Sequence, residues 1–419
     1  MRFHILGVGP IGSLLAYHLR RVMLPTHAIT LIHKNQRQAR EITANGGFMR
    51  VESDGVVMSV DGFEAEVFEN SYARFLNAGT VSGKAGIPRN PPARSQEEEE
   101  KPEPETIESL FITTKAHHTL SAIQRLLPRL SSNSTIVLLQ NGMGVYEQLV
   151  HDVFRNPEKR PHFILASNTH GAWFKGFHNV VHAGIGQIHF GIVPDPVGRQ
   201  FEAALLDESL PKSERRCQLD DIAHLSGDPC FSRYRSLRNT VAALCSLEDA
   251  LNTSWKPIAH VQMSMRRKLV VNAVINPLTA IMGCRNGDLF TTAASRRILQ
   301  RVCQEAADAY AAQIKAETQA WLKTVPGDSA NTESVPVGRI PRSLTKQALE
   351  EECLRVAELT KGNISSMLSD IRRGKGTEVD FINGHLLNLG STYNIPMPAT
   401  ATLLNLVKMR TAIALEQML

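Results

Sequence analysis

The sequence lacks any run of about 20 apolar residues, the length that a membrane-spanning helix needs. It also lacks a CxxC pair, and its six cysteines follow no regular spacing. Scattered cysteines fit reduced thiols in a cytosolic protein better than a disulfide framework, and they predict no metal site. Because the opening "MRFHILGVG" already reads as part of a fold, we expect no removable signal or transit peptide.

No tract concentrates the basic residues, although the net charge is +5. This modest excess suits an enzyme with anionic ligands and is weak evidence for a nucleic-acid partner. The chain has 419 residues with 42% hydrophobic and 21% charged, which predicts a globular protein of two domains. We expect a cytoplasmic protein that binds neither nucleic acid nor a membrane. The oligomeric state is left open, and a homodimer is one assembly compatible with the sequence.

The first 195 residues predict an α/β domain. Apolar strands are expected at 2–6 and 27–33, with a helical segment between them, and such a βαβ unit opens a doubly wound parallel sheet. Further strands of that sheet are predicted at 109–114, 134–140 and 162–168. Segments 56–68 and 179–191 alternate as exposed or antiparallel strands do.

From about residue 235 the strand signals largely vanish, which predicts a mainly α-helical second domain. Its helices are expected at 236–252, 257–283, 293–323, 345–360 and 398–418. We therefore assign 1–195 to the α/β domain, 196–234 to a linker with an insertion, and 235–419 to the helical domain.

Three segments have the composition of insertions. Residues 79–105 are rich in Pro, Gly, Ser and Glu, which predicts a disordered surface loop. The acidic run 97–100 inside it is either an interaction tail or, more simply, part of a solvated loop. Segments 194–232 and 325–341 are expected to loop out from the core.

"GVGPIG" places three glycines at the GxGxxG spacing between the first strand and the first helix. Gly7 permits a tight turn, Gly9 lets a pyrophosphate approach the backbone, and Gly12 allows close packing of the helix. The helix N-terminus adds N–H groups and partial positive charge. We predict that this segment binds a dinucleotide, through Gly7, Val8, Gly9, Pro10, Ile11 and Gly12.

The second strand runs into "HKNQR", where NAD-binding proteins place an acidic residue for the ribose 2'-hydroxyl. Lys34 and Arg37 would instead attract a 2'-phosphate, which favours NADP(H). An ordinary solvated basic turn is the competing interpretation.

Two polar residues follow the ends of predicted strands, Lys115 after "SLFITT" and Asn141 after "STIVLLQ". Ligands of open α/β sheets bind beyond the carboxyl ends of the strands, so both residues are expected near the nicotinamide end of the cofactor. Asn-Gly is also a common turn pair, which is the alternative for Asn141.

In "KLVVNAVINPLTA" the residues Lys268, Asn272 and Asn276 recur every fourth position, which puts them on one face of an otherwise apolar helix. Buried polar groups without partners are costly. One interpretation is that Lys268 extends to water and the amides cap loops. The other is that the stripe lines a cleft, where the lysine protonates a developing alkoxide and the amides bind an oxygenated substrate.

A second polar segment spans 363–386. Gly374 and Gly376 predict a helix break, and "TEVD" offers Thr377 as the N-cap of the next helix with Asp380 three residues on. Glu378 would then lie in a first turn, where a carboxylate is favourable for structural reasons alone. Ser365 or Ser366 could likewise serve only to cap a turn.

Taken in order, "GVGPIG", "TTKA", "QNGMG", "SNTHGA", "RKLVVNAVINPLTAIMGCRNGDL" and "SSMLSDIRRGKGTEVDFINGHL" resemble the ketopantoate reductases (2-dehydropantoate 2-reductases). The resemblance runs from residue 1 to about 415, interrupted by the three insertions, which are typical of a eukaryotic, fungal-like member. It implies a Rossmann-type domain followed by a helical domain of the 6-phosphogluconate dehydrogenase type. It also implies NADPH-dependent reduction of ketopantoate to pantoate, on the route to pantothenate and coenzyme A.

The resemblance further implies roles for single residues. Lys268 would be the general acid, and Glu378 would bind the hydroxyl side of the substrate and help to hold the lysine. Asn272, Asn276 and Ser366 would contact substrate, Asn141 would bridge substrate and nicotinamide, and Lys115 and Glu378 would lie at the cofactor. Where bacterial relatives place an arginine for the 2'-phosphate, this chain offers only Lys34 or Arg37.

Two other functions are compatible with the sequence. The stripe does not specify the dimethyl group, so a reductase of another branched 2-keto acid remains an alternative. A non-catalytic NADP-binding redox sensor is the alternative of another class, although it need not keep both Lys268 and Glu378.

Overall fold

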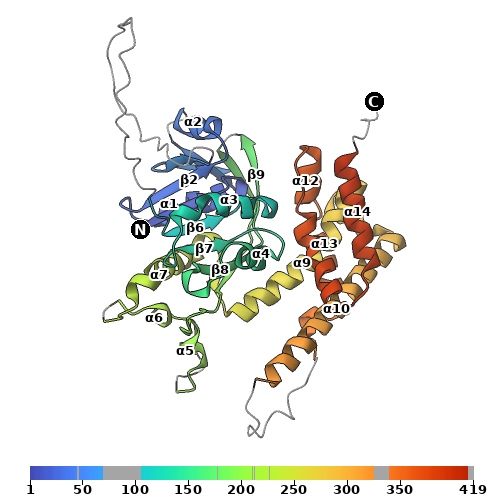
Figure 1. Cartoon of the computed structure of the whole chain (residues 1–419). Helices are drawn as coiled ribbons and strands as arrows, with labels where there is room; N and C mark the ends of the chain where they lie inside the picture. Colours follow the sequence, from blue (N-terminus) through green and yellow to red (C-terminus); the bar gives the residue numbers. More distant parts are fainter. Residues whose placement is uncertain are drawn as a thin grey trace, which may run out of the picture. The chain divides into compact units, whose positions relative to one another are not determined.

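The structure, a computed structural model, describes residues 1–44, 47–68, 105–176, 178–209, 211, 213–225, 227–324 and 339–413. The chain divides into two compact units (Figure 1). Unit 1 comprises Met1–Thr114, His118–Gln140 and Asp152–Ile258. Unit 2 comprises Lys115–His117, Asn141–His151 and Ala259–Leu419. Three separate stretches of the chain therefore contribute to each unit.

Unit 1 is built on an eight-stranded sheet with the order β12-β11-β8-β7-β6-β1-β2-β5. Its strands are β1 (Arg2–Leu6), β2 (Ala28–His33), β5 (Glu64–Val67), β6 (Ser109–Ile112), β7 (Thr135–Leu138), β8 (His162–Asn168), β11 (Ile188–Ile192) and β12 (Thr253–Trp255). All neighbours pair in parallel except β8 and β11. Strands β6, β7 and β8 are buried at every residue, as parallel strands covered on both faces should be. The predicted parallel sheet is confirmed.

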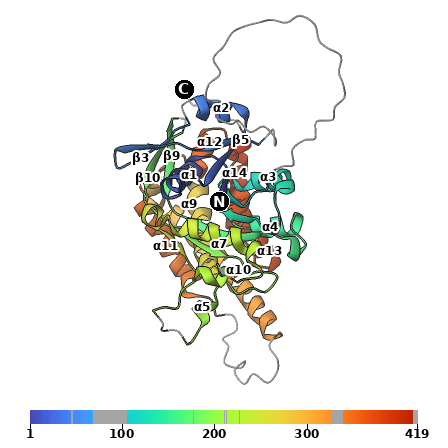
Figure 2. The ribbon, with the colours of Figure 1, turned by 90° about the vertical axis from the view of Figure 1, so that its left-hand side faces the viewer.

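A second, four-stranded sheet has the order β4-β3-β10-β9. Its strands are β3 (Met49–Ser53), β4 (Val56–Val60), β9 (Gly171–Gly176) and β10 (Asn179–Gly184). The pairs β3–β4 and β9–β10 are antiparallel, whereas β3 and β10 pair in parallel. Helix α1 (Pro10–Val22) contacts strands of both sheets and lies beside β9 and β10 in Figure 2. Segments 56–68 and 179–191 thus contain antiparallel strands as predicted, but β5 joins the main sheet.

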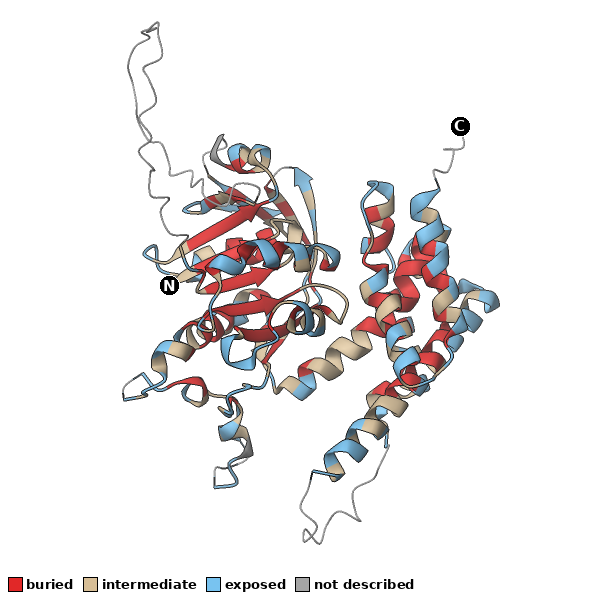
Figure 3. Cartoon of the chain, viewed as in Figure 1, coloured by how far each residue is buried: buried red, intermediate tan, exposed pale blue. Residues whose placement is uncertain are grey.

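Unit 1 contains further helices besides α1. They are α2 (Gln36–Ala44), α3 (Thr119–Leu126), α5 (Ala203–Leu206), α6 (Leu219–Ile222), α7 (Phe231–Cys245) and α8 (Glu248–Leu251), with short 3-10 turns at Ala116–His118, Leu127–Arg129 and Pro157–Lys159. Figure 3 shows that the buried residues gather on the strands and on the helix sides that face them.

Parts of the segment 194–232 pack onto unit 1, so the expectation that it loops out from the core was wrong for those parts. Phe201 and Ile222 are buried in the apolar core of the unit. Arg199 pairs with Asp228 at 2.8 Å, and its guanidinium lies 4.4 Å from the centre of the Tyr234 ring. A few apolar anchors outweigh the polar composition of the segment. Most of the predicted insertions 79–105 and 325–341 lies outside the described residues.

Helix α7 belongs to unit 1, although the sequence assigned residues from 235 onward to the helical domain. Ser236 and Thr240 on α7 bond to the hydroxyls of Thr135 on β7 and Ser109 on β6, at 2.8 and 2.7 Å. Strand β12 follows and pairs with β11. Because of these contacts, unit 1 extends along the chain to Ile258.

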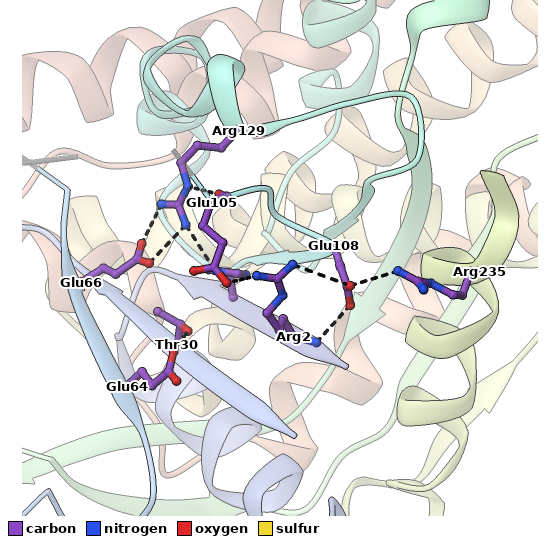
Figure 4. A network of polar contacts seen from close by, with 9 residues as sticks. Arg2, Thr30, Glu64, Glu66, Glu105, Glu108, Arg129 and Arg235 are labelled. Atoms are coloured by element: carbon purple, nitrogen blue, oxygen red, sulfur yellow. Dashed lines mark hydrogen bonds and ion pairs between the residues drawn. The ribbon is translucent and has the colours of Figure 1, made fainter. Parts of the chain in front are cut away.

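A network of ion pairs lies around the start of β1 in unit 1 (Figure 4). Arg129 is 6% exposed and binds both carboxylate oxygens of Glu66 on β5, at 2.7 and 3.1 Å. It also donates to the backbone carbonyl of Glu105 at 2.9 Å. Arg2 pairs with Glu105 and with Glu108. Bidentate, charge-assisted contacts of this kind fix strand ends far apart in the sequence.

Unit 2 is helical. Its helices are α4 (Val145–Asp152), α9 (Ile258–Met282), α10 (Ala293–Leu322), α11 (Lys346–Leu359), α12 (Ser366–Arg372), α13 (Val379–Thr392) and α14 (Pro398–Ala412), with 3-10 turns at Asn286–Thr291 and Arg342–Leu344. Helix α10 packs against α11, α13 and α14. The helices predicted at 257–283, 293–323, 345–360 and 398–418 correspond to α9, α10, α11 and α14. None of the described helices combines the length and the apolar character that crossing a membrane requires.

Candidate functional site

The glycine-rich turn joins β1 to α1 in unit 1. Gly7 has a φ of +102°, and a Cβ on it would lie 2.5 Å from the backbone nitrogen of Thr114. A Cβ on Gly12 would collide with the Gly7 carbonyl oxygen. A Cβ on Gly9, in contrast, would meet nothing within 4 Å. Two of the glycines are therefore required by close packing, and the third leaves open backbone that a ligand can approach.

The N-terminus of α1 fits an anionic ligand. Gly9 is the N-cap and has no side chain to bond the first N–H groups, and the first turn holds no acidic residue. Pro10 contributes no N–H, so the N–H groups of Ile11 and Gly12 remain without a helical acceptor. These donors and the helix dipole suit the pyrophosphate of a dinucleotide.

The end of β2 carries positive charge and no carboxylate. His33 is buried, and burial lowers its pKa to about 4, so that it is neutral at pH 7. Lys34 and Arg37 are exposed, and Arg37 pairs with Glu41 at 3.0 Å. Asn35 accepts a hydrogen bond from the backbone N–H of Gln38 and so starts α2. The local charge at this turn comes from Lys34 and Arg37.

In unit 2 the predicted polar stripe lies on α9. Lys268 and Asn272 are partly exposed, whereas Asn276 is 8% exposed. The Nζ of Lys268 donates to Oδ1 of Asn141 at 2.8 Å. Burial lowers the pKa of Lys268 to about 8, against the opposing effect of the Glu378 charge. A lysine with such a pKa gives up a proton near neutral pH far more readily than an exposed one.

Glu378 connects the start of α13 to the segment 115–117. It is 5% exposed, and its Oε1 accepts from the backbone N–H of Ala116 at 3.1 Å. Its Oε2 accepts from Nζ of Lys115 at 3.3 Å, and the same Nζ donates to Oδ2 of Asp370 at 2.7 Å. Burial alone would lower the pKa of Lys115, but Glu378 and Asp370 together raise it above its ordinary value. Lys115 is thus held as a cation between two carboxylates.

Helix α13 begins one residue later than predicted. Glu378, and not Thr377, takes the N-cap position, and its side chain makes no capping bond. Asp380 pairs instead with Lys408 at 2.7 Å. The carboxylate of Glu378 is directed to Lys115 and Ala116, where the positive charge of Lys115 strengthens the contact.

The turn after Asn141 is fixed against α13. Gly142 and Gly144 have φ values of +90° and +93°, and the N–H of Met143 donates to the carbonyl of Phe381 at 3.0 Å. A Cβ on Gly142 would lie 2.6 Å from that carbonyl oxygen. The Asn-Gly pair therefore does form a turn, and the turn holds Asn141 where it meets Lys268.

The two serines before α12 differ. Ser365 is buried, caps α12 through the N–H of Leu368 at 3.1 Å, and lies 2.7 Å from the hydroxyl of Thr279. Ser366, the predicted partner of the substrate carboxylate, is the first residue of α12 and is exposed. The sequence reasoning missed Asp370, although it lies four residues after Ser366 on the same helix face.

The structure thus brings Lys268, Asn141, Lys115 and Glu378 into two bonded groups within unit 2. The predicted cofactor residues of the glycine turn and of the β2 end lie in unit 1. Among the described residues, no group of His, Cys, Asp or Glu is placed to hold a metal ion.

A dinucleotide-type glycine turn on a parallel sheet, together with a helical unit that carries a partly buried lysine and a buried glutamate, defines a two-unit oxidoreductase. Residues 3–195 match the family model described as "Ketopantoate reductase PanE/ApbA", and residues 260–411 match "Ketopantoate reductase PanE/ApbA C terminal". The chain belongs to the ketopantoate reductase family.

Similar proteins agree with this assignment. A protein of Schizosaccharomyces pombe named "Probable 2-dehydropantoate 2-reductase" is 23% identical over 408 residues, which cover 97% of this chain and 95% of the relative. Such coverage by a yeast protein confirms the expected fungal-like member. A ketopantoate reductase structure from Ralstonia eutropha has a TM-score of 0.62 at 18% identity and covers 98% of both chains. D-mandelate dehydrogenase with NADH and anilino(oxo)acetate has a TM-score of 0.63 at 15% identity, again with 98% coverage of both.

Proposed function

We propose that the protein reduces 2-dehydropantoate (ketopantoate) to (R)-pantoate with NADPH, a step toward pantothenate and coenzyme A. The observation that carries the proposal is Lys268, a lysine with its pKa lowered to about 8, bonded to Asn141 and in the field of Glu378. Membership of the ketopantoate reductase family supports the choice of substrate. We further propose a cytoplasmic location.

Gly7, Gly9 and Gly12 would hold the pyrophosphate of the cofactor, with the N–H groups at the start of α1. Lys34 and Arg37 would hold the 2'-phosphate, which favours NADPH over NADH. When bound, the cofactor supplies a hydride to the ketone carbon.

Lys268 donates a proton to the ketone oxygen as negative charge develops there. Its partly buried site helps, because the neutral amine left after the transfer escapes the desolvation that lowers its pKa. Asn141 accepts a hydrogen bond from Nζ and so orients the donor.

The remaining side chains bind the substrate. Asn272 and Asn276, from the same face of α9, would donate to its oxygens, and Ser366 would bind the carboxylate. Glu378 would bind the hydroxyl group while its charge favours the protonated form of Lys268. Lys115 balances the charge of Glu378.

A second candidate is a reductase of another branched 2-keto acid. A lysine and two amides can bind the oxygens of a keto acid, but they do not select its branched alkyl group. A panel of 2-keto acids at equal concentration separates the two, since the proposed function requires the highest kcat/KM for ketopantoate. A redox sensor without catalysis is disfavoured, because it has no need for the bonded groups of Lys268 and Glu378.

The test is turnover of ketopantoate, followed by loss of nicotinamide absorbance with NADPH and, in parallel, with NADH. Lys268→Ala is expected to lower kcat by about 10²–10⁴-fold, the usual share of a general acid, while the protein stays folded and binds NADPH. Lys361→Ala is the matched control, since the side chain of Lys361 is 68% exposed. An unchanged kcat in Lys268→Ala would refute the role of the lysine, and bound cofactor without turnover in the unmodified protein would refute the enzyme.

A further inference from the structure

Helix α9 contains a proline in its interior. Pro277 is buried, and the helix continues through it from Ile258 to Met282. Proline has no N–H, so the carbonyl four residues earlier, that of Ala273, loses its helical donor. Ala273 is fully buried, which leaves no water to replace that donor.

Helix α13 supplies the missing donor. The Nδ2 of Asn383 donates to the carbonyl oxygen of Ala273 at 3.0 Å. Asn383 is fully buried, and its Oδ1 accepts no hydrogen bond from the described residues. Among the described residues, the buried amide of Asn383 thus makes one hydrogen bond. Its acceptor is a carbonyl that lacks a helical donor because of Pro277.

This hydrogen bond lies the same number of residues along the chain from Lys268 as from Glu378. Ala273 follows Lys268 by five residues on α9, and Asn383 follows Glu378 by five residues on α13. Five helical residues span about 7.5 Å, so the contact lies about that far along each axis from the side chain it serves. If α13 shifted along α9, Glu378 would move relative to Lys268 by the distance of that shift.

A second contact docks the neighbouring helix on the same part of α9. The hydroxyls of Thr279 and Ser365 lie 2.7 Å apart, and Ser365 caps α12. Helix α12 carries Asp370, the partner of Lys115. The segment around Pro277 thus receives both helices that supply carboxylates to the site.

We infer that Pro277 and Asn383 are positioning residues, which set the spacing of Lys268 and Glu378 through the freed carbonyl of Ala273. The inference rests on the proposed function for its kinetic part. Its structural part, the dependence of the Asn383 bond on Pro277, stands without it.

The test is a double-mutant cycle of the full-length protein with Asn383→Ala, Pro277→Ala and both changes together. Pro277→Ala returns an N–H to position 277, so Ala273 then has a helical donor whether or not Asn383 is present. Asn388→Ala is the matched control, because Asn388 is an exposed asparagine of the same helix. Urea midpoints, kcat and KM for ketopantoate are measured for each protein.

Asn383→Ala is expected to lower kcat about 10- to 100-fold with a smaller change in KM, as misplaced catalytic groups do, while Asn388→Ala stays within twofold of the unmodified protein. In the Pro277→Ala background the shift of the urea midpoint caused by Asn383→Ala should shrink to less than half. An equal shift in both backgrounds would overturn the link to the freed carbonyl. A lowered midpoint with unchanged kcat would overturn the positioning role. If the unmodified protein does not turn over ketopantoate, the proposed function fails, and the urea cycle alone decides the structural part.

Discussion

At the scale of single residues, the proposed role of Lys268 depends on its protonation state. Burial lowers the pKa of this lysine to about 8, and Glu378 acts in the opposite direction. A proton donor works only while protonated, so kcat is expected to be level at lower pH and to fall as pH rises through about 8. The check is kcat with saturating substrates between about pH 6 and 10.

Glu378→Gln removes the charge that raises the pKa of Lys268, so the descending limb measured on the residual activity should move to lower pH. Asp380→Asn is the control, because Asp380 lies on the same helix with its side chain 60% exposed. A limb that stays in place in Glu378→Gln would assign the titration to another group.

The sequence predicted some contacts of the candidate site residues and not others. The spacing of Lys268, Asn272 and Asn276 fixes them on one helix face, since i and i+4 neighbours are a local property. The bond between Lys268 and Asn141 joins residues 127 positions apart, and no local pattern contains it. Asp370 was missed for the same reason, because only the fold brings it to Lys115.

At the scale of elements, the turn 141–144 is shaped by its contact with α13. Gly142→Ala would place a Cβ 2.6 Å from the carbonyl oxygen of Phe381, so the turn must move and carry Asn141 away from Lys268. We expect kcat to fall about 10- to 100-fold. Gly283→Ala has a comparable φ of +71° but no atom within 4 Å, so it should cost only about 1 kcal/mol of backbone strain. Equal kinetic losses in both variants would show that strain, and not the contact, is responsible.

The helices and strands themselves were largely predictable from the sequence. Their end residues, and the unit to which each belongs, were not. Periodicity located α10 and α11 because each repeats an apolar stripe over several turns, and α9 was located as a long apolar segment that carries one polar stripe. It could not assign α7 to unit 1, because the hydroxyl pairs that hold α7 to β6 and β7 look like ordinary polar positions. The start of α13 was misplaced because Glu378 follows a tertiary partner and not a capping rule.

At the scale of the whole molecule, buried histidines are distributed unequally. His18, His33, His162 and His178 in unit 1 have pKa values lowered to about 4 by burial, whereas His385 is the described counterpart in unit 2. Between about pH 6.5 and 4 the unfolded chain binds more protons than the folded one. The free energy of unfolding therefore decreases as the pH is lowered through this range. We therefore expect unit 1 to unfold at a higher pH than unit 2 on acidification. The expected loss in its free energy of unfolding is several kcal/mol in total.

Limited proteolysis at falling pH, with the cuts mapped by mass spectrometry, checks this order. His18→Leu should shift the first cuts in unit 1 to lower pH, since neither ring nitrogen of His18 has a partner among the described residues. His224→Leu, at an exposed position, should leave them unchanged. First cuts in α10 to α14 would contradict the expected order.

The division of the chain into interleaved segments has a consequence for synthesis. Lys115 and Asn141 leave the ribosome early, yet they become part of unit 2. Glu378, the partner of Lys115, is translated 263 residues after it. The sheet of unit 1 can form while translation continues, but Lys115 acquires its carboxylate partners only after Asp370 and Glu378 have been made. A nascent chain cut short before α13 would hold the parallel sheet of unit 1 but not the carboxylate of Glu378.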